Sequence, residues 1–220
     1  MENKGTKIIA VIALAVAVSG FTIGFAAFSN TLSISSSAEV SPEGSKFDVN
    51  FSTSGTEELP GTVTPTLNPT SVNNFTADNA TINNDSAPTI TGLHANFTEP
   101  GQKAEYNFYV HNAGEYIAYL NSVTFANIEQ QTSSKKCTAK EGTTQSLVDA
   151  ACEDINITVQ VGENVYQASE ANITGKSLEL DAYSPVKVTI EYKINSNINI
   201  ADGDFDVAFG DITLTYSSVD

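Results

Sequence analysis

Runs in which apolar and polar residues alternate constrain this chain more than any other feature of its sequence. In the clearest run, apolar side chains occupy every second position: Val186, Val188, Ile190, Tyr192 and Ile194. Lysine, threonine and glutamate fill the positions between them. Because successive side chains of a β-strand point to opposite faces, this period predicts a strand with one buried face and one solvent-exposed face.

The same alternation recurs along the chain, with turn residues between the runs. Three further apolar faces are Ala104, Tyr106, Phe108 and Val110; Ile155, Ile157, Val159 and Val161; and Phe205, Val207 and Phe209. Residues 162–164 predict a hairpin turn, and Gly210-Asp211 breaks the alternation, which predicts a β-bulge. Only one or two helical turns are expected, between the two cysteines. Many short strands separated by turns predict an all-β fold, an antiparallel β-sandwich.

Residues 53–87 differ in composition from these runs. They contain Pro60, Pro65 and Pro69 and many Thr, Asn and Ser, with isolated apolar residues between them. Proline cannot donate a backbone hydrogen bond, and such a mixture is typical of loops. We expect a long loop or insertion with little regular structure, within a single sandwich domain over residues 27–220.

The N-terminus carries the pattern of a secretory signal. Lys4 and Lys7 flank the start of an apolar stretch over residues 8–28. We predict cleavage between Ala26 and Ala27, which makes the first 26 residues a signal peptide. In the alternative, residues 8–28 remain as an anchor, because about 20 apolar residues cross a bilayer core. Both interpretations predict that the rest of the chain is secreted or displayed at the cell surface.

The charge of the exported part excludes nucleic acid as a partner. Without residues 1–26 the chain keeps 25 acidic and 8 basic residues, a net charge of −17, and it contains no arginine. Such a surface repels phosphate backbones and anionic lipid headgroups. We therefore expect contact with a membrane only through residues 8–28, before or without cleavage.

The two cysteines, Cys137 and Cys152, are expected to be bonded to each other. An even pair in an exported chain is typical of a disulfide, and a zinc site would need further ligands close by. No cofactor is predicted.

A strand pattern begins directly after the predicted cleavage site. Its apolar face contains Phe28, Leu32, Ile34, Ala38 and Val40, and mostly serine and threonine form the other face. In one interpretation this strand pairs within its own sheet. In the other it adds to the open edge of the next subunit, where main-chain hydrogen bonds give affinity and alternate side chains give register.

Three stretches of the sequence carry a family resemblance. Residues 24–30, GFAAFSN, are followed by a strand and look like the substrate of a SipW-type signal peptidase. Residues 99–114 form a proline-glycine turn, an amphipathic strand and an Asn-x-Gly turn, and residues 211–217 form a closing strand. In these features the chain resembles the TasA/camelysin family of exported Gram-positive surface and biofilm-matrix proteins.

The resemblance implies a jelly-roll-like sandwich that is exported to the cell surface or matrix. It also implies self-association into fibres by donation of the N-terminal strand, here residues 27–40, beside other envelope or matrix proteins. The cysteine pair and the segment 53–87 depart from the family pattern.

The sequence lacks the motifs of common hydrolases. A zinc protease needs two histidines one helical turn apart, as in H-E-x-x-H, whereas His94 and His111 are seventeen residues apart. We expect both to be exposed histidines near strand ends. No G-x-S-x-G motif is present either, so we do not expect an enzyme, and camelysin-like protease activity is disfavoured.

Calcium is the one inorganic partner that the sequence suggests. Asp202, Asp204, Asp206 and Asp211 lie close together in the sequence and carry the hard oxygen ligands that calcium prefers. Their spacing does not match an EF-hand loop, and acidic residues are common on the solvent-exposed face of a strand.

Our leading interpretation is a secreted or cell-surface structural protein, a biofilm-matrix fibre subunit. One alternative is a type IV pilin-like subunit, cleaved after Gly5 to retain the apolar helix, although Lys7 does not fit that alternative. Others are a membrane-tethered binding module and a camelysin-like metalloprotease. The mature N-terminus separates cleavage at Ala27 from these alternatives, which predict Thr6 or an intact chain.

Overall fold

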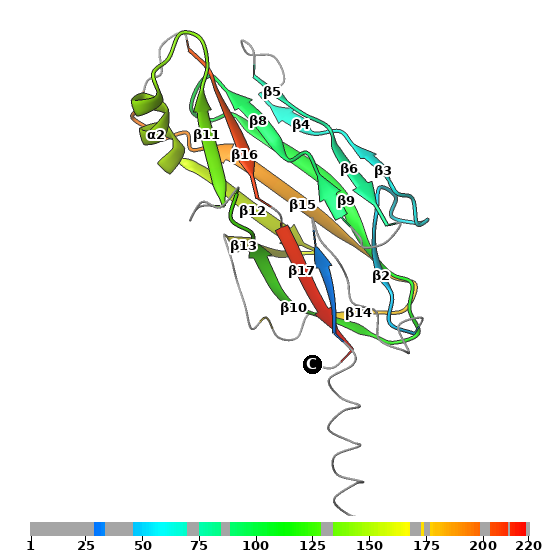
Figure 1. Cartoon of the computed structure of the whole chain (residues 1–220). Coiled ribbons are helices and arrows are strands. Elements are labelled where there is room, and N and C mark those ends of the chain that lie inside the picture. Colours follow the sequence, from blue (N-terminus) through cyan, green and yellow to red (C-terminus); the bar gives the residue numbers. More distant parts are fainter. Residues whose placement is uncertain are drawn as a thin grey trace, which may run out of the picture.

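The chain folds into antiparallel β-sheets with one short helix among the residues described. The computed structural model describes residues 29–33, 46–69, 75–84, 89–128, 134–167, 173, 177–198, 203–210 and 212–218. Figure 1 shows an elongated body in which most strands run along its length. The all-β prediction is confirmed at this level.

A six-stranded sheet forms one layer of the body. Its strand order is β13 (Asn164–Gln167), β12 (Ile155–Val161), β15 (Tyr183–Tyr192), β9 (Lys103–Asn112) and β2 (Val49–Ser52), and β4 (Thr66–Asn68) also pairs with β9. The predicted apolar face of β9 is buried: Ala104, Tyr106, Phe108 and Val110 are at most 1% exposed. The predicted strand extended to Ile194, but β15 ends at Tyr192, because a hydrogen bond from the backbone N–H of Ser196 to the carbonyl oxygen of Lys193 closes a turn there. Ile194 lies in this turn, outside the sheet, and is 74% exposed.

Two four-stranded sheets lie along the other side of the core. One has the order β1 (Ser29–Ser33), β17 (Ile212–Ser217), β10 (Ala118–Phe125) and β14 (Ser177–Leu178). The other has the order β11 (Lys135–Ala139), β16 (Phe205–Phe209), β8 (His94–Phe97) and β5 (Thr76–Ala77). Figure 1 shows β16 and β17 continuing from one sheet into the other.

The chain changes sheets between β16 and β17, next to Gly210, where the sequence predicted a bulge; Asp211 lies outside the described residues. β16 pairs with β11 and β8, whereas β17 pairs with β1 and β10. Gly210 packs so closely against the backbone of Ala126 that a Cβ atom added to it would lie 2.1 Å from the carbonyl oxygen of Ala126. The irregularity in register lies instead on β10, between Leu120 and Ser122.

Aromatic rings join the layers. Tyr192 of the six-stranded sheet packs edge-on against Phe97 and Phe205 of the facing sheet, with ring centroids 6.1 and 5.6 Å apart. All three rings are fully buried. Such edge-to-face pairs add about 0.5–1.5 kcal/mol each to the effect of burial. This packing gives the fold its sandwich-like core.

The segment 53–87 contains more regular structure than predicted. β3 (Gly61–Val63), β6 (Ala80–Asn83) and β7 (Thr89–Thr91) form a three-stranded sheet. Its isolated apolar residues Val63 and Ile82 are buried, so packing against the core orders strands that are too short for periodicity to reveal. Thr62, Thr81 and Thr91 pair in register on the exposed face.

Helix α2 (Gln145–Glu153) is the predicted helix between the cysteines. The expected disulfide joins Cys137 of β11 to Cys152 of α2, with Cα atoms 6.0 Å apart. The helix buries Val148 and Ala151 completely. Lys135 donates from its ammonium group to the carbonyl oxygens of Cys152 and Ile155, which holds the end of the helix against β11.

We expect the substitution Gly210→Ala to lower the free energy of unfolding by about 2 kcal/mol or more, because the new methyl group would overlap the Ala126 carbonyl. Gly55→Ala is the matched control: its Cβ would meet the outer ring atoms of the partly exposed Tyr109, at 2.9 and 3.0 Å, and that ring can turn. Its cost should stay below about 1 kcal/mol. Urea unfolding of both variants measures the difference, and equal midpoints would contradict it.

Removing the disulfide in the double variant Cys137→Ala, Cys152→Ala should lower the free energy of unfolding by about 3 kcal/mol, because the bond closes a loop of about 15 residues in the unfolded chain. Thr138→Ala, at an exposed position on the same strand, is the control and should change the stability little. Calorimetry of the three proteins tests this expectation. A double variant as stable as Thr138→Ala would show that the bond does not constrain the unfolded chain.

Candidate functional site: the β1 edge and the His94 network

β1 lies at the edge of its sheet and pairs antiparallel with β17. The five residues of β1 face five residues of β17, from Ser29 opposite Ser217 to Ser33 opposite Thr213. The other edge of β17 is paired with β10. Within the described residues, β1 is therefore the strand that forms hydrogen bonds with the backbone N–H and C=O groups on the edge of β17 that β10 does not occupy.

The predicted donor strand is only partly covered by the described residues. Leu32 lies in β1, opposite Leu214. Phe28, Ile34, Ala38 and Val40, and the predicted cleavage pair Ala26 and Ala27, lie outside the described residues.

The acceptor strand β17 has a well-buried inner face. Ile212, Leu214 and Tyr216 alternate inward and are at most 1% exposed. A strand with this pattern has a fixed register, because a shift by one residue would turn its apolar face outward. The same property lets the β17 edge accept a paired strand in one register.

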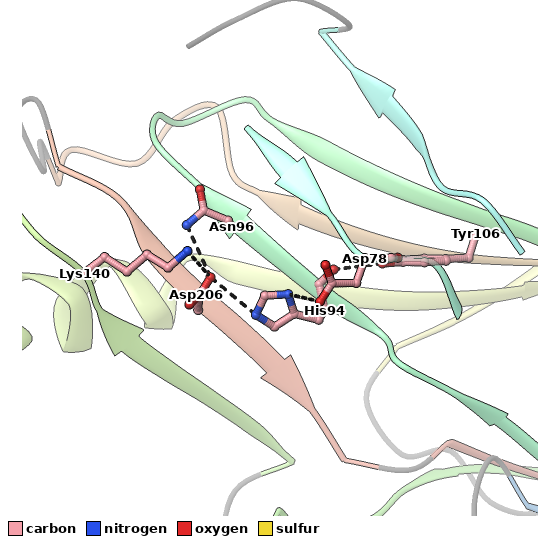
Figure 2. A network of polar contacts seen from close by, with 6 residues as sticks. All are labelled: Asp78, His94, Asn96, Tyr106, Lys140 and Asp206. Carbon is pink, nitrogen blue, oxygen red and sulfur yellow. Dashed lines mark hydrogen bonds and ion pairs between the residues drawn. The ribbon is translucent and has the colours of Figure 1, made fainter. Parts of the chain in front are cut away.

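Figure 2 shows a polar network around His94 of β8. The Nδ1 atom of His94 lies 3.1 Å from Oδ2 of Asp78, and its Nε2 atom lies 3.4 Å from Oδ1 of Asp206. The Nδ1 atom is buried and, despite the short distance to Asp78, makes no hydrogen bond of good geometry within the described residues.

Asp206 is the centre of this network. Its Oδ1 atom lies 3.0 Å from the ammonium group of Lys140, and it accepts a hydrogen bond of 3.3 Å from the side-chain amide of Asn96. The same amide donates to Asp204 at 3.1 Å. The structure therefore brings the predicted calcium ligands Asp204 and Asp206 to one amide, beside a cationic side chain.

The calcium site stays a prediction. Asp202 and Asp211 lie outside the described residues. Among the residues that the structure covers, no three His, Cys, Asp or Glu side chains are grouped to hold a metal ion. Asp204 and Asp206 already have amide and ammonium partners, which a calcium ion would have to replace.

Tyr106 of β9 connects the six-stranded sheet to this network through hydrogen bonds of its hydroxyl group. Its hydroxyl group lies 2.9 Å from the carbonyl oxygens of both Asp78 and His94, and it can donate its single proton to either of them. Burial raises the pKa of Tyr106 to about 12, and the nearby Asp78 carboxylate adds a smaller contribution in the same direction. Sequence periodicity placed Tyr106 in the core but gave no sign of this contact.

His111 corrects the expectation of an exposed histidine. It is only 8% exposed, and its ring stacks on Tyr183 with a centroid distance of 4.1 Å. Its Nδ1 atom lies 3.4 Å from Oε2 of Glu58, in the segment after β2. Burial and the charge of Glu58 raise the pKa of nearby Asp48, and Asn50 and His111 oppose this shift. The adjacent polar turn suggested exposure, but β9 runs through His111 to Asn112, and β2 and β15 pair with it on either side.

An open depression of about 540 Å³ lies between β11 and α2. Lys136, Gln145, Asp149 and Glu153 line it beside the disulfide. Both cysteines are bonded to each other, so this depression offers no thiol nucleophile.

No protein-family model, curated protein or solved structure matches this chain. The resemblance to the TasA/camelysin family thus stays a prediction. Within the described part of the chain, no helix is long and apolar enough to cross a membrane, and residues 8–28 lie outside that part.

We expect Tyr106→Phe to lower the free energy of unfolding by about 1 kcal/mol at neutral pH, through loss of the hydroxyl contact. An unfolded tyrosine ionises near pH 10.0, whereas Tyr106 in the folded protein does so near pH 12. Its raised pKa therefore stabilises the fold below pH 10, and this stability is lost as the pH rises toward 12.

Denaturant titrations of the two proteins from pH 8 to 12 measure this effect. The phenylalanine variant should lose less stability than the wild type over the alkaline range. Since burial also raises the pKa of Tyr192 and Tyr216, both proteins should retain some alkaline dependence. Parallel stability curves would show that Tyr106 ionises as an ordinary tyrosine.

Proposed function

We propose that this chain is a secreted or cell-surface structural protein whose subunits assemble into fibres by exchanging the N-terminal strand β1. The observation that carries the proposal is the position of β1. It is the first described strand, it lies at a sheet edge, and it pairs in a defined register with β17. The jelly-roll-like topology and the relation to biofilm-matrix proteins, which the sequence suggests, belong to the same proposal.

Strand exchange replaces contacts within a subunit by the same contacts between subunits. If β1 leaves its own body, the backbone groups along the outer edge of β17 become available to an identical strand. The pairing of Leu32 with Leu214 would then recur between subunits. The β17 edge therefore binds β1 of another subunit in the same conformation in which it binds its own.

The chain between β1 and β2 is long enough for exchange. Fifteen residues, 34–48, separate the two strands. At about 3.3 Å per residue, an extended chain of this length spans up to about 50 Å. This reach allows β1 to pair with a neighbouring body while its own body stays folded.

Cleavage between Ala26 and Ala27 would supply the free end that exchange requires. A strand attached to a membrane anchor is held close to its own body, whereas a strand freed at Ala27 can enter another subunit. Analysis of the N-terminus of the native protein tests this step. Ala27 supports the proposal, whereas Thr6 indicates a pilin-like subunit and Met1 a tethered protein.

We expect a protein that begins at Ala27 to polymerise and a variant lacking residues 27–40 to stay a folded monomer. A synthetic peptide of residues 27–40 should bind this shortened monomer. A peptide of the same composition in scrambled order should not bind it, because only the native order matches the β17 register.

Light scattering and electron microscopy measure the assembly, and fluorescence anisotropy of a labelled peptide measures binding. Circular dichroism of the shortened variant checks that the sandwich folds without β1. If the Ala27 protein remains monomeric across salt and calcium concentrations, or if both peptides bind equally, strand exchange is wrong.

A further inference from the structure

One end of the body gathers the start of β1, the end of β17 and the start of β10. Ser29 is paired with Ser217, which is paired in turn with Tyr119 of β10. The loop before β10 and the loop after β14 extend beyond these residues at the same end. Figure 1 shows this end, around β14, opposite the end that carries α2.

Three large apolar side chains are exposed on these two loops. Tyr116 is 38% exposed, Ile117 is 44% exposed and Leu180 is 50% exposed. Elsewhere in the described chain, Leu59, Leu147, Val165 and Ile194 are exposed singly on separate elements. We call Tyr116, Ile117 and Leu180 the apolar tip.

Hydrogen bonds of the buried Asn112 fix both loops of the apolar tip. Its side-chain amide donates to the carbonyl oxygen of Tyr116 at 2.7 Å and to that of Leu178 at 3.0 Å. The backbone N–H of Asp181 donates to the carbonyl oxygen of Asn112 at 3.0 Å. These hydrogen bonds hold the backbone of both loops in place, so the three apolar side chains have fixed positions on the surface.

The apolar stretch that we predict to enter a membrane directly precedes this end in the sequence. The apolar stretch over residues 8–28 ends one residue before Ser29, and consecutive Cα atoms are about 3.8 Å apart. While this stretch lies in a bilayer, the end of the body that contains Ser29 is held near the lipid surface. A tyrosine beside aliphatic side chains is the composition that suits the boundary between lipid and water.

We propose that, in addition to the membrane contact expected of residues 8–28, the apolar tip rests on the lipid bilayer in the chain that still carries them. The contact orients the sandwich with its long axis away from the membrane and holds the predicted cleavage site at the surface. Glu115, Glu179 and Asp181 flank the tip, so the contact favours zwitterionic over anionic headgroups. This inference concerns the uncleaved chain and does not depend on strand exchange.

The chain contains no tryptophan, so a single introduced tryptophan reports on one position. The test uses the full chain in phosphatidylcholine nanodiscs, with and without lipids brominated near the headgroup. We expect bromine to quench the emission of Ile117→Trp. The matched control is Leu147→Trp on α2, where the replaced side chain is 42% exposed at the other end of the body; it should not be quenched.

Because an introduced tryptophan has its own affinity for the membrane interface, a second measurement uses the unsubstituted chain and follows the exchange of its backbone amide hydrogens. In nanodiscs, backbone amides of residues 115–118 and 179–181 should exchange more slowly than in the protein that begins at Ala27, kept monomeric. Exchange in the segment around Leu147 should be equal in the two samples. Phosphatidylglycerol nanodiscs should give weaker protection of the tip than phosphatidylcholine.

Absence of quenching at position 117, or equal quenching at 117 and 147, would overturn the proposal. So would protection of residues 115–118 that arises only in lipid-free assemblies of the Ala27 protein, because the tip would then be a contact between subunits. Failure of the Ala27 protein to polymerise leaves the lipid contact unaffected, and loss of the lipid contact leaves strand exchange unaffected.

Discussion

Burial of one face of each long strand between two layers is the constraint on which the rest of this structure depends. Tyr192, Phe97 and Phe205 meet between the layers, and each comes from a different strand. Because the layers must stay in register for these rings to pack, the edges of the sheets have fixed positions. The edge of β17, with β1 along it, is one of these positions.

The alternation of residues was sufficient to predict the long strands. A period of two identifies β9, β12 and β15, since each buries several consecutive inward residues and the burial is strong enough to shape the sequence. It failed for strands of two to four residues such as β3 and β5, where a single inward residue carries no period. It also could not show that the chain changes sheets at Gly210, because a bulge and a crossing disturb the alternation in the same way.

The polar contacts were less predictable than the strands, since they join residues far apart in the chain. Asn96 and Asp206 are separated by 110 residues, and only the pairing of β8 with β16 brings them together. The close spacing of the aspartates near residue 204 predicted that they act together. Their partners Asn96, Lys140 and His94 come from other strands and loops, and no local pattern indicated them. The polar turn beside His111 suggested an exposed side chain, but its ring is buried and stacks on Tyr183.

The antiparallel pairing of β1 with β17 determines how the body would respond to mechanical load. Ser29 and Ser217 lie opposite each other, so the chain leaves both strands at the same end. A force that separates the chain before Ser29 from the chain after Ser217 loads the backbone hydrogen bonds between them one after another, as in a zipper. Such a load opens the pair at low force, whereas the longer strands β9 and β15 lie outside its path. The N-terminal strand is thus the element that a pull between the two chain ends would release first.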